Sequence, residues 1–163
     1  MSRPRDLGGR LLSRLDERDG AALPYELATQ VEPIDAQDFA HVVATQWKSD
    51  EAPSKHLTAW LAMFRIAIAY LGCYVTDTDE SLPDDLALWR GVARSRYARG
   101  MSWTLDQEKA VWFARRFATD QDSPRLYRVQ VEPHDVLGYF AGRQESEIVI
   151  DPRLLPRLRG QAL

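Results

Sequence analysis

Two glutamates, Glu145 and Glu147, stand directly before a hydrophobic run in the stretch QESEIVID. On an extended chain, side chains two residues apart share a face, so both carboxylates would point the same way. Ile148 and Ile150 would then face the core. Neighbouring carboxylates raise each other's proton affinity, which favours keeping one neutral until a cationic substrate arrives. The alternative interpretation is a solvated turn at the end of a strand.

A second candidate is Arg90, which lies inside the otherwise apolar run LALWRGV and is followed by Gly91. An arginine in such a run must reach solvent, pair with an acid or bind an anion. Its planar fork fits phosphate oxygens in two-point contacts. Gly91 would let a ligand approach the backbone closely. A purely structural arginine at a strand edge is the alternative.

The third candidate is Ser102, in the stretch Ser102-Trp103-Thr104 that precedes a predicted helix. Thr104 or Asp106 can cap this helix, but capping does not account for Ser102. Trp103 either crowds a ligand beside Ser102 or points into the core, because adjacent strand residues face opposite ways.

In this order and spacing, the three motifs resemble the arginine–serine–glutamate type of mono-ADP-ribosyltransferase. That group contains the clostridial binary toxins and the vertebrate ecto-enzymes. The resemblance covers residues 86–152, and the helix after the second motif also fits through Ala110 and Phe113. Trp103 departs from the family's Ser-Thr-Ser motif, and Thr104 stands in place of its last serine.

The resemblance implies NAD as co-substrate and a transition state with positive charge on the ribose. Glu147 would stabilise that charge and bind the ribose 2′-hydroxyl, and Ser102 would hold Glu147 in orientation. Arg90 would hold the pyrophosphate or the adjacent ribose. Gly91 would offer backbone groups to the nicotinamide carboxamide.

The remaining roles concern the cofactor walls and the acceptor. Thr104 completes the cofactor-binding motif, and Phe113 or Tyr97 would form an aromatic wall for nicotinamide. Glu145 would select a guanidinium acceptor, because a carboxylate pairs with it in two-point contacts. The acceptor-recognition turn would expose Tyr139, Phe140 and Arg143 to a partner.

The composition indicates a soluble globular chain of 163 residues, with 45% hydrophobic and 28% charged residues. The formal net charge of -3 gives no global case for nucleic acid or membrane surfaces. A single cysteine, Cys73, and three scattered histidines predict no metal site. The charged N-terminus has no apolar signal core and no run is long enough for a membrane span, so a cytoplasmic location is expected.

The pattern of elements predicts a single α+β domain over 1–163, with N-terminal helices followed by a mixed, mostly antiparallel β core of the ADP-ribosyltransferase type. Residues 1–30 are expected to form a loose arm and residues 34–72 a helical part. Asp35 and Ser54 are the expected N-caps of its two helices, and Gly72 the expected C-cap of the second. Residues 86–152 form the predicted catalytic sheet core, and the segment PRLLPRLRG is interpreted as a basic tail.

The core is expected to contain one helix at 105–118 and strands at 86–92, 100–104, 126–131, 136–140 and 147–151. The helix would direct Ala110, Phe113, Ala114 and Phe117 to one face.

The sequence therefore predicts an NAD-dependent mono-ADP-ribosyltransferase, acting as a toxin or effector, with a protein arginine as the favoured acceptor. An NAD glycohydrolase and a transferase acting on nucleic acid or a small molecule remain alternatives. Two further classes stay open. One is a catalytically inactive binding module on the same fold, and the other is a structural protein whose Trp47, Trp60 and Trp112 mark packing.

Overall fold

The computed structural model describes residues 35–50, 53–142 and 146–163, which belong to two compact units divided between Thr76 and Asp77. The expected arm at 1–30 lies outside the described residues. The expectation of a single domain over 1–163 stays a prediction.

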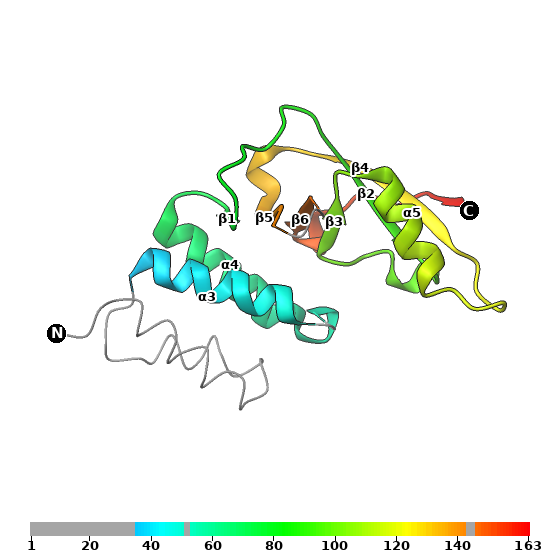
Figure 1. Ribbon diagram of the computed structural model, residues 1–163, viewed down its shortest axis with the longest axis horizontal. Coiled ribbons are helices and arrows are strands. Elements are labelled where there is room, and N and C mark those ends of the chain that lie inside the picture. Colours follow the sequence, from blue (N-terminus) through cyan, green and yellow to red (C-terminus); the bar gives the residue numbers. More distant parts are fainter. Residues whose placement is uncertain (1–34, 51–52, 143–145) are drawn as a thin grey trace. The chain divides into compact units, whose positions relative to one another are not determined.

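In the first unit, helices α3 (Ala36–Ser49) and α4 (Leu57–Leu71) lie side by side and are followed by the short strand β1 (Val75–Thr76) (Figure 1). Asp35 caps α3 as predicted, because its Oδ1 accepts a hydrogen bond from the Gln37 backbone N–H at 2.8 Å. None of the helices in the described ranges is long and apolar enough to cross a membrane.

The two helices pack through an aromatic cluster. The Trp47 ring meets those of Trp60 and Phe64 edge-on, with centroid separations of 5.1 Å and 5.3 Å. The buried Trp60 also donates its Nε1–H to Asp50 Oδ2 at 2.7 Å, which satisfies its one polar group. Trp47 and Trp60 therefore mark core packing, as the structural alternative expected, whereas Trp112 is 48% exposed on α5.

The start of the second helix differs from the prediction. A 3₁₀ turn, η2 (Pro53–His56), precedes α4, and no side chain caps its N-terminus, so Ser54 as N-cap is wrong. Ser54 lies inside this tighter turn. The predicted C-cap is confirmed, because Gly72 has φ 75° and donates its N–H to the Ile68 carbonyl at 2.8 Å.

The second unit holds an antiparallel sheet and one helix, α5 (Gln107–Arg116). Its strands follow the spatial order β5-β6-β3-β2-β4-β7, and every pairing among them is antiparallel. The α+β class and the mostly antiparallel sheet are confirmed. The strands are β2 (Leu86–Val92), β3 (Ser102–Thr104), β4 (Arg125–Val131), β5 (Val136–Phe140), β6 (Glu147–Ile150) and β7 (Gly160–Ala162).

A strand that the sequence did not predict begins at the last residue of the expected basic tail at 152–160. Residues Gly160–Ala162 form β7 and pair with the start of β4. The segment GQA lacks the apolar alternation that identifies strands, so no local pattern predicts it.

Helix α5 packs on β2, and Gly91 makes the close approach possible (Figure 1). A Cβ at Gly91 would overlap the carbonyl oxygen of Ala110 and would lie 2.9 Å from the Cβ of Ala114. Both alanines are buried on α5, as the sequence predicted. Phe117, expected on the same face, is 65% exposed just beyond the helix end.

We expect Gly91→Ala to destabilise the protein by roughly 3 kcal/mol, because the added methyl meets helix backbone that cannot rotate away. The urea unfolding midpoint measures the change. Gly72→Ala is the comparison, because a Cβ there meets nothing and the cost is limited to about 1–2 kcal/mol of left-handed backbone strain. Equal losses for the two variants would contradict the packing argument.

Candidate functional site

The guanidinium of Arg90 is bound to two backbone carbonyls from the segment that follows β2. Its Nε–H donates to the Tyr97 carbonyl at 3.1 Å, and its Nη1–H donates to the Ser102 carbonyl. Tyr97 ends the 3₁₀ turn η3 (Ser95–Tyr97), and Ser102 begins β3. Arg90 therefore ties the loop after β2 to the neighbouring strand.

Arg90 projects from β2 on the side opposite Gly91, since adjacent strand residues point to opposite faces. Leu86 and Leu88, which share that side with Arg90, are fully buried. Burial lowers the pKa of Arg90 to about 10, and the negative charge of Glu147 acts in the opposite direction. The guanidinium thus stays charged at neutral pH, and its surroundings favour an anion beside it.

Gly100 leaves the space that this guanidinium occupies. A Cβ at Gly100 would overlap the Nη2 and Cζ atoms of Arg90. Gly100 belongs to none of the three sequence motifs. Its position at the turn into β3 was the available signal, because an isolated glycine at a strand end often marks a close approach.

The second and third motifs lie opposite each other on β3 and β6. Thr104 pairs with Glu147, and Ser102 pairs with Val149. Ser102 is thus diagonal to Glu147, at about 7–8 Å between Cα atoms for such a pair, and Thr104 is its direct neighbour. The residue placed best to orient Glu147 is Thr104 rather than Ser102.

The two side chains around Ser102 have structural roles. Trp103 is 2% exposed and donates its Nε1–H to the Gly100 carbonyl at 2.9 Å, so it lies in the core and does not crowd a ligand beside Ser102. Asp106 caps α5 by accepting the Lys109 N–H at 3.0 Å. Thr104 accepts the Asp106 N–H through its hydroxyl, also at 3.0 Å.

Ser146, between the two glutamates, has φ 43°, in the left-handed region that non-glycine residues rarely adopt. The backbone at Ser146 is therefore not extended, so the reason given for Glu145 and Glu147 to share a face does not hold. The Ser146 carbonyl accepts the Leu105 N–H at 3.2 Å, which anchors this turn to the start of the α5 loop. Glu145 itself lies outside the described residues.

Two residues of the expected acceptor turn are buried instead of exposed. Tyr139 and Phe140 are 4% and 3% exposed, and both belong to β5. Tyr139 pairs with Ile148 and donates its hydroxyl to Glu80 Oε2 at 3.1 Å, while Phe140 pairs with Glu147. The predicted strand simply continues through them, so neither is available to an acceptor.

Two other assigned residues occupy places that fit their proposed roles poorly. Gly91 faces α5, where the Ala110 carbonyl covers it, so its glycine requirement comes from helix packing rather than from a nicotinamide contact. Phe113 lies on α5, and its ring meets that of Trp112 at 4.9 Å. Tyr97, the alternative aromatic wall, is half exposed on η3. Arg143 lies outside the described residues.

Scans against protein-family models, curated proteins and solved structures each gave no match to this chain. The site must be judged on its own geometry. Within the described parts of the chain, no group of three or more His, Cys, Asp or Glu side chains is placed to hold a metal ion.

An ion pair that the sequence analysis missed fixes the entry to the η3 loop. Arg94 Nε donates to Asp122 Oδ1, and Asp122 Oδ2 accepts from both the N–H and the hydroxyl of Thr119 at 2.8 Å. The loop after β2 is thereby attached to the loop after α5. The partners are 28 residues apart in sequence, so no local pattern indicates the pair.

These bonds, chiefly the one from Arg94, lower the pKa of Asp122 to about 2. A carboxyl with a depressed pKa in the folded state stabilises the protein above its unfolded value of 3.8. We therefore expect the difference in urea midpoint between wild type and Asp122→Asn to be constant above about pH 5 and to shrink as the pH falls toward 2. Asp120→Asn, an exposed neighbour with the same charge change, is the control. A difference that does not change over this pH range would contradict the assignment.

Proposed function

We propose that this chain is an NAD-dependent mono-ADP-ribosyltransferase that transfers ADP-ribose to an acceptor, with a protein arginine favoured, and releases nicotinamide. One observation carries the proposal. The three motifs are separated by many residues in sequence, yet they occupy the three neighbouring strands β2, β3 and β6. The register pairs Trp89, not Arg90, with Thr104. The Arg90 side chain therefore leaves β2 on the face opposite Thr104 and Glu147. The charge of Glu147 still acts on the guanidinium of Arg90.

In the proposed reaction, the bond between ribose C1′ and the nicotinamide nitrogen breaks, and its electron pair leaves with neutral nicotinamide. A nitrogen of the acceptor guanidinium forms the new bond to C1′ and loses a proton. Positive charge develops on the ribose, and a carboxylate beside the ring stabilises it. Glu147 is the residue proposed for this role.

The remaining groups would position the reactants. The partly desolvated guanidinium of Arg90 is suited to the pyrophosphate, because an anion would offset the cost of burying its charge. Thr104, directly opposite Glu147, would orient the carboxylate together with Ser102. The strained backbone at Ser146 supports the proposal as well, since such strain concentrates at functional sites.

An inactive binding module on the same fold is the second candidate, and one observation favours it. Arg90 already donates its Nε–H and one Nη1–H to backbone carbonyls, as an arginine with a purely structural role does. A guanidinium has five N–H donors, so three remain for a ligand. Turnover of NAD, rather than its binding, separates the two candidates.

We expect the wild-type chain to release nicotinamide from NAD in the presence of a cell extract. Glu147→Gln should lower the rate by roughly 100-fold or more, because it removes the stabilising charge and keeps the shape. Glu108→Gln, an exposed residue in the first turn of α5, is the matched control and should behave as wild type. Nicotinamide release by wild type and Glu147→Gln at equal rates would refute the assignment of Glu147.

The same assay, with NAD labelled in its adenylate half, tests the acceptor. Glu145→Gln should lose transfer of label to protein and keep slow release of nicotinamide if Glu145 selects a guanidinium. Release without any labelled product in wild type would indicate the NAD glycohydrolase alternative. Binding of NAD without release would leave the binding module.

Gly100→Ala tests Arg90 without changing any charged group. The new Cβ displaces the end of a flexible side chain, and the backbone of Gly100 is not left-handed, so folding should survive. We expect nicotinamide release to fall roughly 10- to 100-fold, because a displacement of about 1 Å is costly in a catalytic site. Full activity, with a melting temperature close to that of wild type, would show that the position of Arg90 does not matter.

A further inference from the structure

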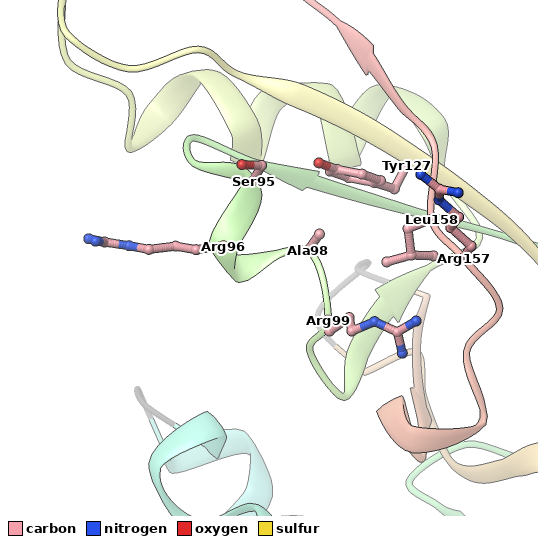
Figure 2. A pocket seen from close by; sticks show the side chains of 7 residues that line it. All are labelled: Ser95, Arg96, Ala98, Arg99, Tyr127, Arg157 and Leu158. Carbon is pink, nitrogen blue, oxygen red and sulfur yellow. The ribbon is translucent and has the colours of Figure 1, made fainter.

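A cavity of about 450 Å³ lies in the second unit, between the η3 loop and the C-terminal segment. This volume is within the range of small-molecule sites. Figure 2 shows that its lining comes from three segments, and that the Arg96 side chain extends away from the other residues at one end. The lining residues are Ser95, Arg96, Ala98, Arg99, Tyr127, Arg157 and Leu158.

The charge of this lining is entirely positive. Three of the seven lining residues are arginines and none is acidic. The carboxylates of Asp122 and Asp151 are taken by other arginines, since Asp122 pairs with Arg94 and Asp151 pairs with Arg153 at 2.7 Å. In the part of the chain that the structure describes, Arg96 and Arg157 form no ion pair, so an anion from outside would meet guanidinium groups with donors to spare.

Arg99 builds the cavity rather than serving as its main donor. Its Nη1–H donates to the Pro152 carbonyl at 3.0 Å, and its Nη2 group donates to the carbonyls of Leu155 and Pro156 at 3.1 Å and 2.8 Å. These bonds fix the C-terminal segment that carries Arg157. Arg99 still adds positive charge to the wall.

The floor is apolar and rigid. Tyr127 is 5% exposed, and its ring lies so close to Gly160 on β7 that a Cβ there would be 2.6 Å from the tyrosine Cζ. Ala98 and Leu158 complete this part of the lining. An apolar floor with a positively charged rim suits a small ligand that carries phosphate on an organic body.

The cavity lies on the same face of the sheet as Arg90, the face opposite Thr104 and Glu147. Tyr127 on β4 pairs directly with Arg90 on β2, so the two residues share a face of the sheet. Arg90 also holds the η3 loop through the Tyr97 carbonyl. Arg90 therefore fixes the loop that carries Ser95, Arg96 and Arg99.

We propose that this cavity binds the phosphate groups of a small ligand, with Arg157 as the principal donor and Arg99 as the residue that fixes the segment carrying it. The phosphate has two possible sources. One source is the diphosphate of NAD; it rests on the proposed function and would leave the adjacent ribose, rather than the pyrophosphate, to Arg90. The other source is a separate phosphate-bearing molecule, which does not rest on the proposed function.

The test is calorimetric titration of the full chain with inorganic pyrophosphate at low salt. Wild type should bind it, and Arg157→Ala should weaken binding about 10-fold, the loss expected for charge-assisted hydrogen bonds. Arg96→Ala should weaken binding far less, because the Arg96 side chain extends away from the other lining residues. Neither side chain donates to the backbone among the described residues, so both variants should fold.

The matched control is Arg128→Ala. Arg128 neighbours Tyr127 on β4 but lies on the other face, 5.7 Å from the Trp89 ring centroid, and its loss removes the same charge. If Arg128→Ala and Arg157→Ala weaken pyrophosphate binding equally, the loss comes from net charge alone, and the proposal is overturned. Failure of wild type to bind pyrophosphate would overturn it as well.

Competition then identifies the source. If NAD and ADP-ribose displace pyrophosphate and neutral adenosine does not, the cavity holds the dinucleotide diphosphate. If pyrophosphate binds and neither NAD nor ADP-ribose competes, the cavity serves a separate phosphate-bearing ligand. Nicotinamide release is scored separately, so pyrophosphate binding without turnover would refute the proposed function and leave this site standing. Nicotinamide release without pyrophosphate binding would refute the phosphate site and leave the proposed function standing.

Discussion

A guanidinium held beside buried leucines costs free energy unless carbonyls or anions surround it, and Arg90 is in that position. The carbonyls of Tyr97 and Ser102 satisfy part of the requirement, and the charge of Glu147 contributes more. These interactions fix the η3 loop against β3. The candidate catalytic strands and the basic cavity both depend on this arrangement.

Glycines make the arrangement sterically possible. Gly91 admits the backbone of α5, Gly100 admits the guanidinium of Arg90, and Gly160 admits the ring of Tyr127. Each glycine is explained by a close neighbour within the protein. A glycine beside a candidate catalytic residue is therefore weak evidence for ligand contact, as the orientation of Gly91 illustrates.

The sequence predicted what depends on local pattern. The apolar stripe of α3 with its Asp35 cap, the glycine that ends α4, and the alternation along β2 and β4 all follow from neighbours a few residues apart. It also predicted that the motif strands lie in one mostly antiparallel sheet. The α+β class could also be predicted, because it follows from elements that local patterns indicate.

What the sequence missed depends on distant partners or on a single backbone angle. Strand β7 has no pattern of its own and exists through pairing with β4. Tyr139 is buried because of its place in the sheet and its bond to Glu80. The left-handed Ser146 looks like an ordinary polar residue in sequence, and nothing local marks its positive φ. The cavity assembles residues from 95 to 158, beyond any local window.

The most direct test of this account compares Arg90→Lys with wild type, following nicotinamide release and the exchange of the backbone amides of 97–100. Lysine keeps the charge but loses the planar fork that spans two carbonyls. The account predicts faster amide exchange in the loop and roughly 100-fold slower nicotinamide release. Wild-type release with Lys at this position would contradict it, because charge alone would then suffice and the geometry at Arg90 would not matter.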